Sequence, residues 1–95
     1  MTFTDFQQSL QKEVPPDFSD LLSALWWDAK GHWEKAHKIA QDVHTNDGSW
    51  VHAYLHRKEG DEFNAGYWYN RAGKSKSRLS LDEEWKNIVK ALLER

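Results

Sequence analysis

The chain repeats its own pattern at an offset of 29 residues. The small residues that coincide are Gly31 with Gly60, Ala24 with Ala53, and Ala36 with Ala65. A glycine accommodates the left-handed turn between two helices, and an alanine at their crossing point lets antiparallel helices approach closely. Each unit is therefore predicted to be a helix, a glycine turn and a second helix, and we expect these units at about residues 18–43 and 50–72.

The apolar positions of the two units correspond as well. Leu21, Leu22, Leu25 and Trp26 fall on Trp50, Val51, Tyr54 and Leu55. No stretch alternates apolar and polar residues for long enough to predict a strand. Helices are also expected at about residues 4–13 and 81–94, where they would cap the two units. The predicted fold class is all-α, with about six short helices in a single domain over residues 1–95.

Capping residues and breaks predict where the helices begin and end. Thr4 with Gln7 and Ser80 with Glu83 have capping-box spacing, and Asp17 is expected to cap the helix that follows it. Glycines typically follow helices, because they tolerate the left-handed conformation found there. The glycines expected at helix ends or turns are Gly31, Gly48, Gly60 and Gly73, with Gly66 alone inside a helix.

The composition excludes several kinds of protein. There is no cysteine, so neither a disulfide framework nor a thiolate metal site is expected. No segment approaches the ~18 apolar residues of a membrane span, and the first residues lack the pattern of a signal peptide, so we expect a cytoplasmic protein without a membrane partner. The basic run Arg71 to Arg78 is short in a chain of net charge -2, so nucleic acid is not an expected partner.

Two segments resemble a known helical repeat. "KGHWEKAHKIAQDV" (Lys30–Val43) and "EGDEFNAGYWYNRAG" (Glu59–Gly73) are similar to the turn and second helix of tetratricopeptide repeats, although those have a longer period of about 34 residues. The resemblance implies two tetratricopeptide-like helix-turn-helix units. The segment Trp50–Lys74 also resembles the centre of a family of small bacterial proteins; that likeness covers about residues 18–95 and implies a fold but no activity.

His52 and His56 lie four residues apart, on one face of a predicted helix. Three interpretations are open: packing against neighbouring aromatic rings, a divalent metal site, and an acid-base or ligand-contact role. Packing is the first expectation, because Ala53 follows His52 where a zinc-protease motif would have glutamate. We therefore predict no metal and no cofactor, and hold the pair as an alternative ligand or metal site.

The functional expectation is a non-enzymatic module that binds a protein or a peptide, by analogy with the fold. Aromatic and arginine side chains are the usual anchors of such surfaces. The contact residues predicted are Trp50, Tyr54, Arg57, Tyr67 and Arg71. No catalytic residue is predicted, although an enzyme using His52 and His56 is an alternative, and a homodimer that buries the excess aromatic rings is another. Asp28 with Arg57, and Asp42 with Arg71, are expected to form ion pairs between the units.

Overall fold

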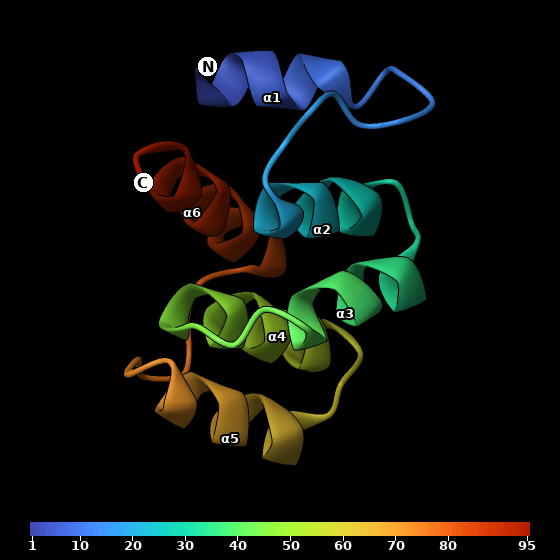
Figure 1. Ribbon diagram of the computed structural model, residues 1–95. Coiled ribbons are helices and arrows are strands. Elements are labelled where there is room, and N and C mark those ends of the chain that lie inside the picture. The colour runs from blue at the N-terminus through green and yellow to red at the C-terminus, as the bar shows by residue number, and fades with distance from the viewer.

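The computed structural model describes all residues from 1 to 95, which form six helices and no strand (Figure 1). The helices are α1 (Phe3–Ser9), α2 (Asp20–Ala29), α3 (Trp33–Gln41), α4 (Asn46–Lys58), α5 (Glu62–Arg71) and α6 (Leu81–Leu93). None of them combines the length and the apolar character needed to cross a bilayer. The prediction of an all-α fold is confirmed.

Two helix-turn-helix hairpins, α2–α3 and α4–α5, form the centre of the fold. Successive helices pack on one another from α2 to α5, as Figure 1 shows. Gly31 and Gly60 make the two turns with φ angles of +87° and +89°, which confirms their predicted role. The four alanines shared by the units, Ala24, Ala36, Ala53 and Ala65, are all 0 % exposed. They therefore lie where the paired helices make their closest contacts.

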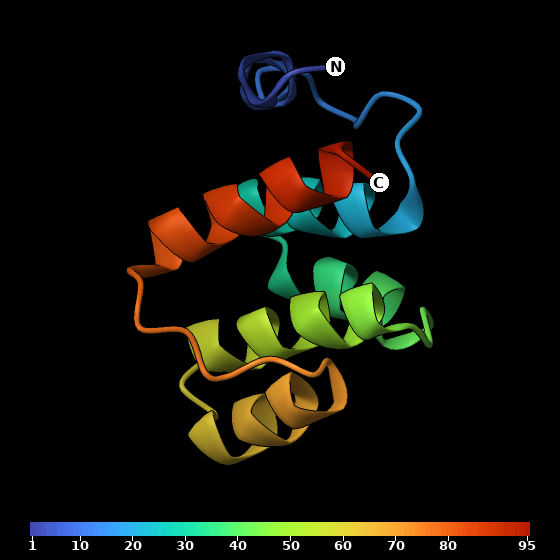
Figure 2. The same cartoon turned by 90° about the vertical axis from the view of Figure 1, so that its left-hand side faces the viewer.

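The last helix does not cap the end of the stack. α6 packs against α2 and α4, and α1 packs against α6, whereas α4 is the one helix on which α5 packs (Figure 2). The expectation that residues 81–94 would cover the free end of the second unit is therefore wrong. The physical reason is that α2 and α4 are apolar on most sides, and the apolar stripe of α6, with Ile88 and Val89 both fully buried, covers the side that α3 and α5 leave open.

Two of the three predicted helix caps differ from the prediction. The first capping box is formed by Thr2 with Asp5, through hydrogen bonds of 3.0 and 3.1 Å, so α1 begins before Thr4 and ends at Ser9. Asp17 does not cap α2, which begins at Asp20, because Phe18 packs on Phe6 and keeps the preceding segment outside the helix. The third prediction, Ser80 as the cap of α6, is confirmed, because its hydroxyl accepts from the Glu83 amide at 3.1 Å.

The fourth helix begins earlier than expected, at Asn46, and includes Gly48. Thr45 caps it by accepting a hydrogen bond from the Gly48 amide at 3.0 Å. A Cβ atom at Gly48 would lie 1.9 Å from the Val43 carbonyl oxygen. The glycine therefore permits a close contact of two backbones inside a helix rather than marking a break.

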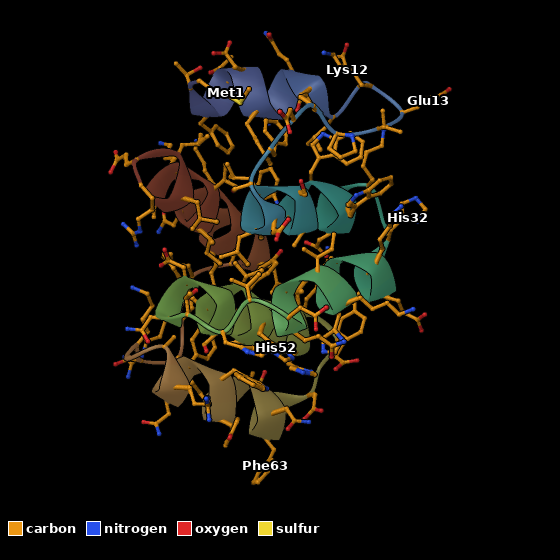
Figure 3. The ribbon with its side chains drawn as sticks, in the orientation of Figure 1. Met1, Lys12, Glu13, His32, His52 and Phe63 are labelled. Carbon is orange, nitrogen blue, oxygen red and sulfur yellow. The ribbon has the colours of Figure 1, made fainter.

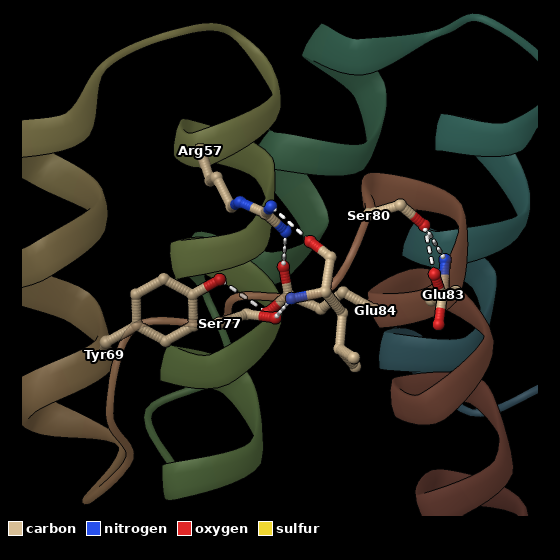
Figure 4. Close-up of polar contacts among 7 residues, drawn as sticks. Arg57, Tyr69, Ser77, Ser80, Glu83 and Glu84 are labelled. Atoms are coloured by element: carbon tan, nitrogen blue, oxygen red, sulfur yellow. Dashed lines mark hydrogen bonds and ion pairs between the residues drawn. The ribbon is translucent and has the colours of Figure 1, made fainter.

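The ion pairs that link the units also differ from the prediction. Asp28 accepts from Lys58 at 3.0 Å, and Arg57 donates to Glu84 of α6 at 2.7 Å (Figure 4). Adjacent residues of a helix point about 100° apart, so Arg57 and Lys58 reach different neighbours. Asp42 and Arg71 form no ion pair.

Candidate metal centre

Three histidines from two helices converge in the fold, with His52 buried and His37 and His56 partly buried. His37 lies on α3, and His52 and His56 lie one turn apart on α4. The Nε2 atoms of His37 and His52 are 2.9 Å apart, and one ligand nitrogen from each of the three rings lies within 4.8 Å of the others. Figure 3 shows His52 in the middle of the molecule, between α4 and α5. The predicted pair is thus part of a three-histidine cluster.

Two tryptophans hold these rings in place. Trp33 stacks on His37 with ring centroids 4.8 Å apart and planes 10° apart, and Trp68 stacks on His52 at 4.1 Å and 21°. The Trp33 indole is itself fixed, because its Nε1 donates to the Leu55 carbonyl at 2.8 Å. Such stacking limits ring rotation, so the convergence of the three rings is already organised by the fold.

A carboxylate orients the third histidine. The Nδ1 atom of His56 lies 2.7 Å from an oxygen of Glu59, the residue that follows the last one of α4. This bond occupies Nδ1 and leaves Nε2 as the nitrogen available to a ligand. A carboxylate bound to the outer nitrogen of a histidine is the usual second layer of a metal site, where it fixes the tautomer and makes the ring a stronger ligand.

The cluster favours neutral imidazole. Burial, reinforced by the neighbouring histidines, lowers the pKa of His52 to about 4, and burial also lowers the pKa of His37. Because His52 is only 6 % exposed, a proton on its ring would place a poorly solvated charge beside two other imidazoles. A metal ion binds the deprotonated nitrogen, so these two rings are in the ligand-competent form at neutral pH.

The dimensions are compatible with a small divalent ion. Zinc binds imidazole nitrogen at ~2.0–2.1 Å, which places the ligand nitrogens of a tetrahedral site about 3.3 Å apart. The 2.9 Å separation between His37 and His52 would need to widen by only a few tenths of an ångström. Three protein ligands would leave the fourth position of a tetrahedral ion open. A second group, His56, Glu59 and Asp61, also offers ligand atoms within 4.8 Å of one another and shares His56 with the first.

Sequence reasoning missed His37, which lies on another helix from the histidine pair. Its i+4 spacing from Trp33 and its place on the second helix of the first unit were visible in the sequence. In a stack of hairpins that helix packs against the first helix of the next unit, which carries His52 and His56. Combining the repeat with this packing order would have brought the three residues together.

The residues predicted to contact a partner do not form one surface. Tyr54 is 2 % exposed, because α6 covers its side of α4, so it is not available to a partner and that prediction is corrected. Arg57 is committed to Glu84, and Trp50 is partly buried with the Lys74 ammonium 4.1 Å from its ring centroid. Only Tyr67, which is 51 % exposed, and Arg71 lie together at the surface, with their side chains 3.2 Å apart.

Comparison with known proteins gives no match, whether the chain is set against family descriptions, curated proteins or solved structures. The tetratricopeptide likeness and the likeness to a bacterial family therefore stay predictions. The two hairpins and the histidine cluster are described by their own geometry.

Proposed function

We propose that the protein binds a divalent transition-metal ion, with zinc as the leading candidate, through His37, His52 and His56. The observation that carries the proposal is the convergence of three ligand nitrogens from two helices, one of them backed by the carboxylate of Glu59. Simple packing would explain two stacked histidines. It gives no reason for a third histidine with a ligand nitrogen within 4.8 Å of the other two and a carboxylate bound to its Nδ1 atom.

The ligand set favours some ions over others. Imidazole nitrogen suits zinc, copper, iron and nickel, whereas magnesium and calcium take oxygen ligands. The chain has no cysteine, so thiolate ligands do not compete for the ion. An open fourth position is the arrangement that lets a bound zinc ion hold a water molecule or a small ligand. We therefore infer a nitrogen-rich site with a vacant coordination position.

The test is calorimetric titration of chelator-treated protein with zinc chloride. Wild type should bind one ion per chain with a rise in melting temperature, and His37→Gln, His52→Gln and His56→Gln should each weaken binding strongly. Glu59→Gln should weaken it by about 10- to 100-fold, because the second layer orients His56. His32→Gln and His44→Gln are matched controls, because both histidines are exposed and lie outside the cluster.

The result that overturns the proposal is equally definite. If wild type binds zinc no more tightly than the variant lacking all three clustered histidines, the cluster is a packing feature. If His32→Gln or His44→Gln loses as much affinity as the cluster variants, the ion binds elsewhere. Circular dichroism of each variant separates lost binding from lost folding.

A second candidate function, protein or peptide binding, is supported by one observation on α5. Phe63 is 87 % exposed and Tyr67 is 51 % exposed on a helix that packs on α4 and on no other helix. Phe63 extends away from the rest of the molecule in Figure 3. Large exposed rings are common anchors of protein interfaces. The test is co-precipitation of partners with wild type and Phe63→Glu, using Val14→Glu as a control at another exposed apolar residue; equal capture by both variants contradicts it.

A further inference from the structure

A cavity of about 410 Å³ lies beside the histidine cluster, between the end of α3, the start of α4, and α5. His52 and Trp68 form one side of it, and Arg71 lies at another. Neither His37 nor His56 lines it. Its volume falls within the range of about 300 to 1,000 Å³ usual for small-molecule sites. The cavity is therefore a separate feature that touches the candidate metal centre only through His52.

No carboxylate lines this cavity. Arg71 is its cation, and the only polar side-chain contact of that guanidinium is with the Tyr67 hydroxyl at 3.2 Å. The one acidic residue of α4, Asp47, is bound instead to Arg95 through contacts of 2.9 and 3.1 Å and is not part of the lining. The charge of Arg71 is thus not neutralised by the protein.

The first turn of α4 also faces the cavity, through Asn46, Gly48 and Ser49. The first amides of a helix have no partner within the helix, and only that of Gly48 is satisfied by the capping Thr45. A helix of this length carries a partial positive charge at its N-terminus. Backbone N–H groups there are a common binding site for phosphate.

Ser49 supplies an independent observation. It is 8 % exposed, it lines the cavity, and its hydroxyl makes no hydrogen bond to the rest of the protein. A serine hydroxyl that makes no bond within the protein keeps its donor free for a ligand in the cavity that it lines. The structure thus presents an unpartnered hydroxyl, an unpaired guanidinium and free helix amides around one space.

We propose that this cavity binds the phosphate group of a small phosphorylated molecule. Arg71 would pair with the phosphate oxygens, the start of α4 and the Ser49 hydroxyl would donate to them, and the remainder of the ligand would lie along Trp68. A bare phosphate ion would leave much of a 410 Å³ cavity unfilled, so a phosphate ester suits the volume better than inorganic phosphate. The proposal does not depend on metal binding, because the lining excludes His37 and His56.

The experiment is a titration of chelator-treated, ¹⁵N-labelled protein with inorganic phosphate, followed by NMR at constant ionic strength. We expect saturable shifts confined to the amides of Asn46 and Asp47 and the Trp68 indole. Arg71→Gln should weaken binding about tenfold or more, because it removes a charge-assisted hydrogen bond. Arg78→Gln, which removes the same charge from the same basic run outside the lining, should leave binding unchanged. Ser49→Ala is a second variant that keeps the charge.

Three outcomes would overturn the proposal. One is a set of linear shifts spread over all basic residues, which would indicate unspecific charge screening. Another is equal weakening by Arg71→Gln and Arg78→Gln. The third is saturation by acetate but not by phosphate, which would assign the cavity to a carboxylate. Because the chelator keeps metal out, a failed zinc titration and a failed phosphate titration remain separate results.

Discussion

Arg57 of α4 donates to the carboxylate of Glu84 in α6 at 2.7 Å, although Glu84 is only 2 % exposed. The same carboxylate accepts from the Tyr69 hydroxyl of α5, and Arg57 also donates to the Leu79 carbonyl in the link before α6 (Figure 4). One buried acid therefore joins three helices. This contact connects α5 to α6, which do not pack on each other directly.

Removing the Arg57 cation from this contact should lower the free energy of unfolding. Arg57→Met leaves the Glu84 carboxylate buried without its partner, and such a loss costs about 3–5 kcal/mol of unfolding free energy. Pairing it with Glu84→Gln should recover part of that loss, because the buried charge is then gone. Urea unfolding of the two single variants and the double variant measures the coupling. If the losses of unfolding free energy in the two single variants simply added in the double variant, the contact would be contradicted. As a control, Arg78→Met, at an exposed arginine, should change the unfolding free energy little.

The second buried acid, Asp28, should respond differently. It is 2 % exposed, its Oδ2 atom has no hydrogen bond, and burial raises its pKa against the lowering effect of Lys58. A raised pKa in the folded state favours the uncharged carboxyl. Its contribution to stability is therefore present at pH values below the unfolded pKa of about 3.9 and is lost as the pH rises through the folded value.

At pH 7, the free energy of unfolding of Asp28→Asn should consequently lie within about 1 kcal/mol of the wild-type value or exceed it. The free energy of unfolding of Lys58→Met should be lower than that of Asp28→Asn by about 1–3 kcal/mol, because this change leaves the buried carboxylate unpaired. The measurement is urea unfolding of both variants at pH 7. If Asp28→Asn proved as damaging as Lys58→Met, the charge on Asp28 would be stabilising instead.

Two glycines inside helices should tolerate alanine unequally. At Gly48 the added Cβ would lie 1.9 Å from a backbone oxygen of Val43, which cannot move without shifting the chain. We expect Gly48→Ala to cost about 1–3 kcal/mol. At Gly66 the nearest atom is the end of the Lys76 side chain, 2.8 Å away, which can swing aside. Gly66→Ala should be neutral or stabilising by up to about 1 kcal/mol, from helix propensity. Thermal unfolding of the two variants measures these differences in stability. Equal losses of stability in Gly48→Ala and Gly66→Ala would contradict the close contact of Gly48 with Val43.

The metal-free protein should lose stability in mild acid. His52 has a pKa of about 4 when folded, against about 6.5 when unfolded, because burial disfavours its charged form and His37 and His56 lie beside it. A lowered histidine pKa contributes stability above the unfolded value, and that stability is lost as the pH falls from about 6.5 through 4. The full loss is on the order of 3 kcal/mol.

Unfolding by urea at several pH values, with chelator present, measures this loss. His52→Gln should flatten the pH dependence between 6.5 and 4. An unchanged slope in that variant would assign the acid sensitivity to other groups.

Much of the fold was predictable because it is local. Gly31 and Gly60 make their turns through their own backbone freedom, Ser80 caps α6 through contacts within three residues, and the shared alanines are buried by the spacing of one hairpin. Only part of the three-histidine cluster was predictable, because sequence patterns reveal relationships within one helix but not contacts between helices. His52 and His56 share a helix face, whereas His37 joins them only through the packing of α3 on α4.

Apart from the starts of α1, α2 and α4, the helices, the two hairpins and the histidine pair followed from the sequence, because capping, turn conformation and helical spacing act over a few residues. The tertiary structure alone decided where α6 lies, and with it that Tyr54 is buried and that Arg57 pairs with Glu84 rather than Asp28. Nothing in the spacing of residues along the chain specifies which exposed helix side a distant apolar stripe will cover. That choice follows from the total apolar area that the packed helices remove from water.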